Sequence, residues 1–339
     1  MRCLTLMNYL QQQGWVTGFI SLSLPPFLCE KVTERGHHLL WLNPSITVWN
    51  EDYDQQQTCL LLKTIKPTWL IVDHYQLSSS WEQVVAKYCN YLLVIDDLAN
   101  REHQCHLLLD QGLDRQTAAY ANLVNNDCQY LLGADYALLR PEFFFHRQKT
   151  SDNNLHKVIN QNIHSILLSL GGSDQTETVS RLLRILEQTK LSDQCEITLV
   201  AGLSNIDQLS VLAQSSRLEV IIKPYIDDMI DVLLKMDLVI GAGGMSAWER
   251  CCLGVPSLLV VLAANQQENV TALVKRQAAI ELPIADASDA TIITLIDGFI
   301  AKPEQLRDLA LNGQQLIDGG GLPRIATAME SLLLQEVGS

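Results

Sequence analysis

The chain has 339 residues, of which 47% are hydrophobic and 18% are charged, and this length accommodates two domains that each bury a core. With 24 Lys and Arg residues against 38 Asp and Glu residues, its net charge of -14 excludes the basic surface that binding to nucleic acid or to an anionic membrane requires. Neither a signal peptide nor an apolar run of the ~18 residues that span a membrane is visible. We therefore expect a cytoplasmic monomer that acts on a small molecule.

Its nine cysteines are an odd number without the spacing of a disulfide framework, and Cys251 and Cys252 are adjacent. Reduced, mostly buried thiols are therefore expected. His103, Cys105 and His106 superficially resemble metal ligands, but no second cluster of ligands accompanies them. We expect no metal and no cofactor.

The first ten residues carry Cys3, Leu6, Met7 and Leu10 at helical spacing. A doubly wound domain begins instead with a strand, whose C-terminal turn opens the first helix. The first strand of the N-terminal domain is therefore expected to be missing. Short apolar runs, typical of strands buried on both faces of a parallel sheet, follow at residues 15–24, 38–42, 68–73, 91–96, 106–109 and 130–132.

A polar stretch over residues 145–162 marks the expected domain boundary. The strand pattern restarts beyond it, at residues 165–170, 196–201, 219–222, 238–240 and 256–262. We predict two Rossmann-like α/β domains, over residues 1–150 and 163–339. The last helix, over residues 322–334, either stays with the second domain or crosses back to the first.

Two glycine-rich turns follow predicted strands of the second domain. Residues 241–249 read GAGGMSAWE, in which glycines let a phosphate approach the backbone and the helix that follows offers free N–H groups. Glu249, one turn into that helix, can accept hydrogen bonds from a ribose. The second turn contains Gly171, Gly172 and Ser173. The alternative for both is a tight turn with a helix cap and no ligand.

Polar residues also follow three other strands. Asn265 and Gln266 either bond a nucleotide or sugar, or cap the next helix. In the first domain, Asp73 and His74 are candidates for a general base on water, and Tyr75 for a group that orients a substrate. A structural histidine is the alternative for His74. The pair Asp96–Asp97 holds a metal or a sugar, or caps the following turn.

Several stretches together resemble the family of UDP-2,4-diacetamido-2,4,6-trideoxy-β-L-altropyranose hydrolases, which release a free sugar from UDP on the way to pseudaminic acid. They run in family order: Met1–Leu6, Val72–Tyr75, Val94–Arg101, Leu107–Gln111, Leu138–Phe143, Leu170–Asp174, Gly241–Leu253 and Asn265–Gln266. A series of this length is far more specific than one glycine-rich loop.

The resemblance implies a GT-B-like fold related to the MurG transferase, with UDP held mainly by the second domain. Gly243, Gly244, Met245 and Ser246 are then expected at the diphosphate, Glu249 at the ribose and Asn265 at the nucleotide sugar, and Arg2, Gly171, Gly172, Ser173 and Gln266 complete the expected substrate contacts. Departures from the family pattern are His106, Gly112 and the pair Met245–Ser246.

The family base is a histidine in a Gly-x-Gly-His-x-x-Arg turn. Arg2 aligns with the arginine of that turn, so the histidine is expected upstream of Met1, and His37 and His38 lie too far along to replace it. Asp73, His74 and Tyr75 remain the candidate catalytic residues. The expected reaction is hydrolysis of the anomeric C–O bond of a UDP-linked 2,4-diacetamido-2,4,6-trideoxy sugar with inversion. The alternatives are a UDP-sugar glycosyltransferase and a truncated, non-catalytic UDP-sugar-binding protein.

Overall fold

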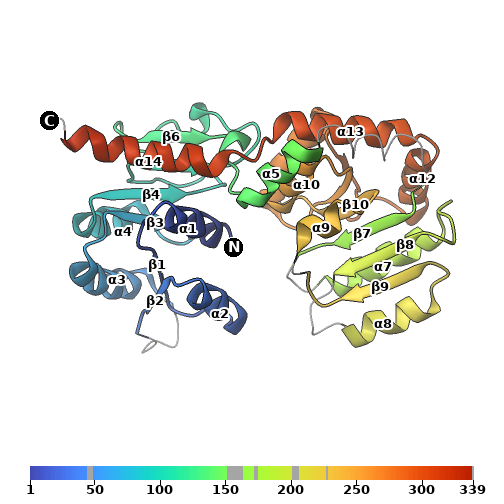
Figure 1. Ribbon diagram of the computed structural model, residues 1–339, viewed down its shortest axis with the longest axis horizontal. Coiled ribbons are helices and arrows are strands. Elements are labelled where there is room, and N and C mark those ends of the chain that lie inside the picture. Colours follow the sequence, from blue (N-terminus) through green and yellow to red (C-terminus); the bar gives the residue numbers. More distant parts are fainter. Residues whose placement is uncertain (44–48, 151–162, 172–174, 201–205, 227, 338–339) are drawn as a thin grey trace. The chain divides into compact units, whose positions relative to one another are not determined.

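The computed structural model describes residues 1–43, 49–150, 163–171, 175–200, 206–226 and 228–337 (Figure 1). Their contacts divide the chain into two compact units: the first is Met1–Arg140 with Gly320–Ser339, and the second is Pro141–Gly319. The first boundary differs from the predicted one, because helix α5 (Pro141–Thr150) groups with the second unit. Helix α14 (Gly321–Val337) groups with the first unit, which is one of the two alternatives left open for the last helix.

The first unit alternates strands with helices. Its elements are α1 (Arg2–Gln12), β1 (Gly18–Ser21), α2 (Pro26–Glu34), β2 (His38–Trp41), α3 (Glu51–Ile65), β3 (Trp69–Val72), α4 (Ser79–Val85), β4 (Tyr91–Ile95), β5 (Leu107–Asp110), β6 (Gln129–Leu132) and α14. The described strands form two separate parallel sheets, β1-β2 and β3-β4-β5-β6. In a doubly wound sheet of order 3-2-1-4-5-6, the strand of position 1 would lie between β1 and β3. The break therefore falls where the missing strand was predicted.

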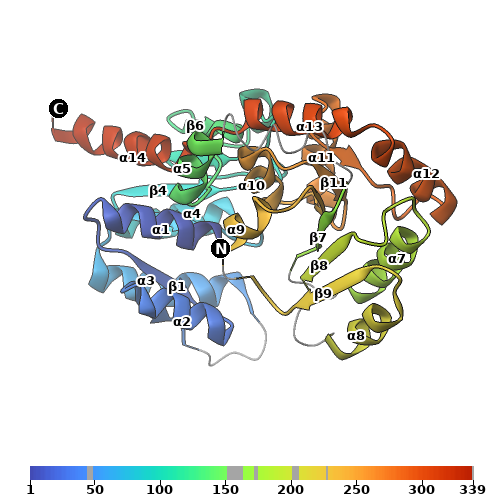
Figure 2. The ribbon, with the colours of Figure 1, turned by 45° about the vertical axis from the view of Figure 1, so that its right-hand side comes forward.

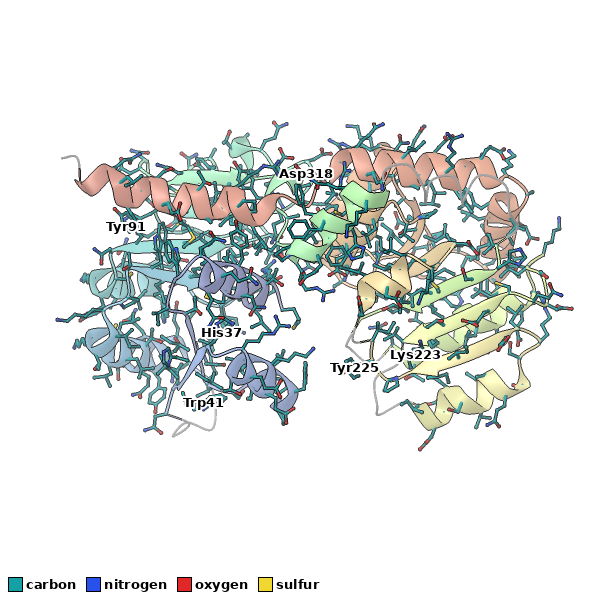
Figure 3. The ribbon with its side chains drawn as sticks, in the orientation of Figure 1. His37, Trp41, Tyr91, Lys223, Tyr225 and Asp318 are labelled. Carbon is teal, nitrogen blue, oxygen red and sulfur yellow. The ribbon has the colours of Figure 1, made fainter. Side chains whose placement is uncertain are left out.

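Alternate residues of β3 and β4 face two helical layers, as the side-chain period of two requires. Leu93 and Ile95 pack with α1 and α14, whereas Leu92 and Val94 pack with α3 and α4. Figure 3 labels Tyr91, whose hydroxyl donates to Leu332 O at 2.9 Å and ties β4 to α14.

The residues of β1 contribute to the same two layers. Phe19 packs against the cluster that contains α1, and Ile20 packs against the cluster that contains α3. Both side chains are only half-buried, whereas every residue of β4 is buried. The two short sheets therefore follow the order of one doubly wound sheet in which no described strand lies between β1 and β3.

The second unit contains a continuous sheet, visible in Figure 2. Its elements are α5, β7 (Ser165–Ser169), α7 (Thr176–Glu187), β8 (Glu196–Val200), α8 (Ile206–Ser215), β9 (Glu219–Lys223), α9 (Met229–Leu233), β10 (Leu238–Ala242), α10 (Ser246–Leu253), β11 (Ser257–Val260), η5 (Ala264–Gln266), α11 (Gln267–Lys275), β12 (Ile280–Glu281), α12 (Asp289–Ile300) and α13 (Pro303–Leu316). The strand order is β12-β11-β10-β7-β8-β9, and all pairs are parallel. This is the doubly wound order, and it reverses between β7 and β10.

Every apolar run predicted to be a strand overlaps one, and β12 is the described strand that was not predicted. At two residues, β12 is too short to produce a periodic signal. Among the described helices, none combines the length and the apolar character that a membrane span needs.

Candidate functional site

The turn between β10 and α10 presents free backbone donors where the strand order of the sheet reverses. Gly243 donates its amide to Val260 O at 3.1 Å, but the amides of Gly244, Met245 and Ser246 have no acceptor among the described residues. Gly244 and Met245 are half-buried and Ser246 is exposed. Free amides at the positive end of a helix form an anion site that suits a phosphate.

The three glycines of this region differ in whether packing requires them. A Cβ atom at Gly243 would overlap Val270 Cγ2, and one at Gly241 would lie 2.9 Å from Arg250 Nη1. Both positions are therefore fixed by packing. A Cβ at Gly244 would lie 3.6 Å from Gln266 Nε2, an ordinary contact. Packing thus does not require a glycine at position 244, and the space beside its backbone is open.

Arg250 is a residue of this site that the sequence analysis did not identify. Its side chain is buried and donates to Ser257 Oγ at 3.1 Å, to Ser246 Oγ at 3.0 Å and to Ala242 O at 2.7 Å. Burial lowers the pKa of the guanidinium to about 10, so that it stays charged at neutral pH. A long basic residue in a short helix gives no sequence signal that distinguishes it from a surface arginine.

The other predicted site residues of the second unit lie near this turn or are not among the described residues. Glu249 is half-buried on α10, and Asn265 is exposed on η5. Gln266 Oε1 accepts from the amide of Leu262 at 3.0 Å, and its side chain makes no cap bond to α11. Gly172 and Ser173 lie outside the described residues.

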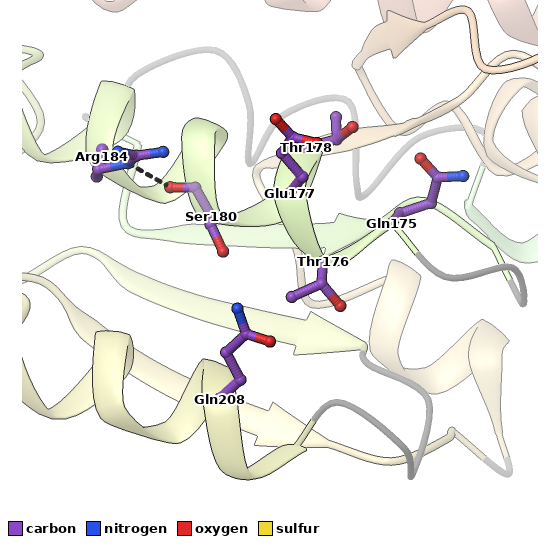
Figure 4. Close-up of a pocket in the computed structure, with 7 residues that line it drawn as sticks. All are labelled: Gln175, Thr176, Glu177, Thr178, Ser180, Arg184 and Gln208. Carbon is purple, nitrogen blue, oxygen red and sulfur yellow. Dashed lines mark hydrogen bonds between the residues drawn. The ribbon is translucent and has the colours of Figure 1, made fainter.

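Gly171 follows β7, which is hydrogen-bonded to β10, so the two glycine-rich turns leave neighbouring strands. Its φ of +97° is one that glycine adopts without strain. A polar cavity of about 580 Å³ lies along the first turns of α7 (Figure 4). Its lining residues are Gln175, Thr176, Glu177, Thr178, Ser180, Arg184 and Gln208, and they include none of the predicted site residues.

In the first unit, Arg2 at the start of α1 binds the aspartate that was predicted as a base. Arg2 Nε and Nη2 donate to the two oxygens of Asp73 at 2.9 and 2.6 Å, and Cys3 Sγ donates to Asp73 Oδ2 at 3.1 Å. Burial acts to raise the pKa of Asp73, but the bonds from Arg2 outweigh it and hold that pKa below its ordinary value. Asp73 is therefore an ion-pair partner with little tendency to take up a proton.

His74 and Tyr75 are also engaged. His74 Nδ1 accepts from the amide of Gln76 at 3.2 Å, so the proton of the neutral ring is assigned to Nε2. Tyr75 Oη donates to Asp97 Oδ2 at 3.1 Å, an oxygen that Arg2 Nη1 reaches at the same distance. At this edge of the sheet, the donors of Arg2 and Tyr75 are therefore bonded to the carboxylates of Asp73 and Asp97.

The remaining histidines of interest are structural. Figure 3 labels His37, which is buried between Thr17 Oγ1 at 2.6 Å and Asn8 Oδ1 at 2.8 Å. His103 Nδ1 lies 2.8 Å from Glu82 Oε1, whereas His106 Nδ1 accepts from the amide of Leu92 at 3.0 Å. His103 and His106 thus belong to different networks. Within the described part of the chain, no three His, Cys, Asp or Glu side chains are grouped to hold a metal.

Asp96 caps the turn that follows β4, which is one of the alternatives that the sequence left open for this residue. Its Oδ2 accepts from the amides of Leu98 at 3.3 Å and Ala99 at 2.8 Å. The carboxylate also accepts from Arg101 Nη1 at 2.8 Å and from Tyr120 Oη at 2.9 Å. A fully bonded, buried Asp96 has no free oxygen for a sugar.

Known proteins resemble this chain in its second unit by sequence and over its whole length by fold. Residues 166–316, all within the second unit, match the family described as Glycosyltransferase family 28 C-terminal domain. Over the whole chain, MurG of Acinetobacter baumannii superimposes with a TM-score of 0.71 at 13% identity, covering 97% of this chain and 95% of that one. The UDP-GlcNAc 2-epimerase of Neisseria meningitidis gives 0.65 at 14% identity, covering 98% and 96%. The protein therefore has the two-domain α/β fold of the GT-B type, as predicted.

Three curated relatives, which carry different names, match parts of the chain. The chain is 26% identical over 212 residues to the spore coat polysaccharide biosynthesis protein SpsG of Bacillus subtilis, covering 60% of this chain and 59% of SpsG. It is 31% identical over 206 residues to the UDP-N-acetylglucosamine--N-acetylmuramyl-(pentapeptide) pyrophosphoryl-undecaprenol N-acetylglucosamine transferase of Carboxydothermus hydrogenoformans, covering 58% and 54%. The UDP-2,4-diacetamido-2,4,6-trideoxy-beta-L-altropyranose hydrolase of Campylobacter jejuni is 24% identical over 223 residues, covering 65% and 76%. The chain thus spans little more than half the length of the first two.

Proposed function

We propose that this protein binds a UDP-sugar and cleaves its anomeric C–O bond, with release of UDP. The observation that carries the proposal is the set of free amides of Gly244, Met245 and Ser246 at the start of α10. They lie where a doubly wound sheet presents its ligand crevice. The match of residues 166–316 to a glycosyltransferase family supports the same assignment.

In this proposal the second unit supplies the leaving-group side of the reaction. The amides at the start of α10 stabilise the negative charge that develops on the diphosphate as the C–O bond breaks, so that UDP needs no strong acid. Glu249 accepts the ribose hydroxyls, and Asn265 and Gln266 bind the nucleotide sugar. Attack from the face opposite UDP inverts the anomeric carbon.

We propose water as the acceptor and a 2,4-diacetamido-2,4,6-trideoxy sugar as the donor substrate, in the synthesis of pseudaminic acid. The support is the Campylobacter jejuni hydrolase, of which the chain covers 76%, against 54% of the Carboxydothermus hydrogenoformans transferase. The higher identity of 31% to that transferase favours a second candidate, transfer of the sugar to an acceptor hydroxyl. The two candidates share the UDP site and differ only in the nucleophile.

The first unit is proposed to handle the sugar and the nucleophile. Its Asp73 is paired with Arg2, and His74 Nδ1 accepts from Gln76, so neither is a free base as they stand. In this proposal His74 becomes a base once its bond to the Gln76 amide breaks, and Arg2 and Tyr75 orient the substrate.

The test is the release of UDP from the UDP-linked 2,4-diacetamido-2,4,6-trideoxy sugar, followed by ³¹P NMR, with the anomer of the product read by ¹H NMR. We expect an inverted free sugar, and a large loss of UDP affinity in Glu249→Gln. UDP-N-acetylglucosamine with an added acceptor is the comparison. Turnover that requires the acceptor would establish the transferase instead, and UDP binding without turnover of either substrate would show that the protein only binds.

A further inference from the structure

Arg250 is a buried cation whose bonded partners are all neutral. The residue is 3% exposed, and its three hydrogen bonds go to a backbone carbonyl and two serine hydroxyls. None of the ion pairs among the described residues includes it. A buried charge is normally paired, because leaving water is costly for an isolated ion.

Other largely buried arginines of this protein follow that rule. Arg2, Arg101 and Arg115 have side chains that are 15%, 19% and 12% exposed, and each lies within hydrogen-bond distance of an aspartate. Arg250 is more buried than any of them. The charge of Glu249 acts on Arg250, but no carboxylate is hydrogen-bonded to its guanidinium among the bonds described, so the cation lacks the direct partner that the other three have.

The surrounding backbone is built to hold the guanidinium in one place. Its partners are Ala242 at the end of β10, Ser246 at the start of α10 and Ser257 at the start of β11. The space that a Cβ of Gly241 would need is occupied by Nη1. The guanidinium therefore contacts both ends of the turn that carries the free amides.

The bond to Ser246 determines what that residue presents to a ligand. Because Arg250 Nη1 donates to Ser246 Oγ, the oxygen lone pair is engaged and the hydroxyl hydrogen is available to donate. Ser246 is exposed and its amide is also free, so hydroxyl and amide offer two donors from one residue.

We infer that Arg250 is a positioning residue of the anion site: it orients the Ser246 hydroxyl as a donor and supplies the positive charge that a bound diphosphate neutralises. The inference rests on the proposed binding of a UDP-sugar. It predicts that Arg250 acts on the phosphates and leaves the nucleoside unaffected, a selectivity that a purely structural role would not produce.

The experiment compares three probes, UDP, uridine and inorganic pyrophosphate, on the full chain by ligand-observed NMR titration. In Arg250→Met, we expect UDP and pyrophosphate to bind about 10- to 100-fold more weakly, with uridine within about twofold of the wild type. Arg250→Lys keeps the charge and should recover part of the loss. Arg181→Met is the matched control, because it removes an arginine of the same unit that pairs with Asp289.

Equal losses for UDP and uridine, or no loss for UDP, would overturn the role of Arg250. If Arg250→Met does not fold, Ser246→Ala decides, since this exposed residue can be changed without opening the core. We then expect UDP to bind about 3- to 10-fold more weakly with uridine unchanged, and unchanged UDP affinity would overturn the inference. If the wild type binds pyrophosphate but not UDP, only the proposed function is wrong. If it binds neither, the proposed function and the role of Arg250 are both wrong.

Discussion

The sheets of the two units follow the same winding rule with different completeness. In the second unit, β7 occupies the central position at which the strand order reverses, and it pairs with β8 on one side and β10 on the other. In the first unit, no described strand occupies the equivalent position, and the sheet is divided into β1-β2 and β3-β4-β5-β6. In both units the side chains of the strands face two helical layers, although no described strand joins β1 to β3 in the first unit.

The two units also differ in how the polar groups at the edges of their sheets are bonded. At the reversal point of the second unit, amides at the start of α10 stay free for an anion. At the corresponding edge of the first unit, Arg2 at the start of α1 is already bound to Asp73 and Asp97. One unit therefore has amides without a described acceptor, which suit an anion, and the other has an internal ion pair.

The largest expected effect is on backbone protection. Amides of β1 and β2 should exchange with solvent about 1000-fold faster than those of β7 and β10, because a sheet of only two strands is marginally stable and opens locally at little cost in free energy. Hydrogen–deuterium exchange with mass spectrometry measures this. Equal protection in the two sheets would mean that β1 and β3 are joined in solution, and would end the comparison.

The second effect is on how the stability of the first unit depends on pH. Burial acts to lower the pKa of His103, but its bonds to Asp96 and Glu82 outweigh it and raise that pKa to about 9. Since the folded pKa is raised, the stabilisation is complete below the unfolded pKa of about 6.5 and is lost as the pH rises through about 9. We expect a loss of about 3 kcal/mol over this window. Urea unfolding at several pH values tests this, and His103→Gln should flatten the curve; an equally steep curve in the variant would assign the effect elsewhere.

The third effect separates a packing glycine from a ligand glycine in the second unit. Gly243→Ala should lower the free energy of unfolding by about 1–3 kcal/mol, because the new Cβ overlaps Val270. Gly244→Ala should change stability by less than about 0.5 kcal/mol and weaken UDP binding by about tenfold. Thermal unfolding and calorimetric titration read the two quantities. If both variants bind UDP as tightly as the wild type, the turn is not part of the proposed site.

The smallest effect concerns the ion pair of the first unit. Asp73→Asn should lower the free energy of unfolding by about 1 kcal/mol, since it breaks the bidentate bond from Arg2 while Asp97 still holds that guanidinium. UDP affinity should not change, because the pair lies outside the proposed nucleotide site. Denaturant unfolding and UDP titration check both parts. An unaltered stability would show that this ion pair contributes nothing measurable to folding.

The sequence by itself determined the parts that depend on local pattern. Apolar runs located the strands, the spacing of Leu6 and Leu10 indicated a helix where a strand is usual, and glycines marked the turn at Gly244. These features are legible because burial on both faces of a parallel sheet and the periodicity of a helix involve neighbouring residues. The predicted fold class followed from their order.

Only the tertiary structure decided how distant residues share their charges. Arg2 and Asp73 are 71 positions apart, so no pattern reveals that the predicted base is held by an arginine. The same holds for Arg250, whose burial depends on the space above Gly241, and for α14, which packs in the first unit with α1. Pairing, burial and protonation depend on which segments meet in space, and this is the information that a local pattern does not contain.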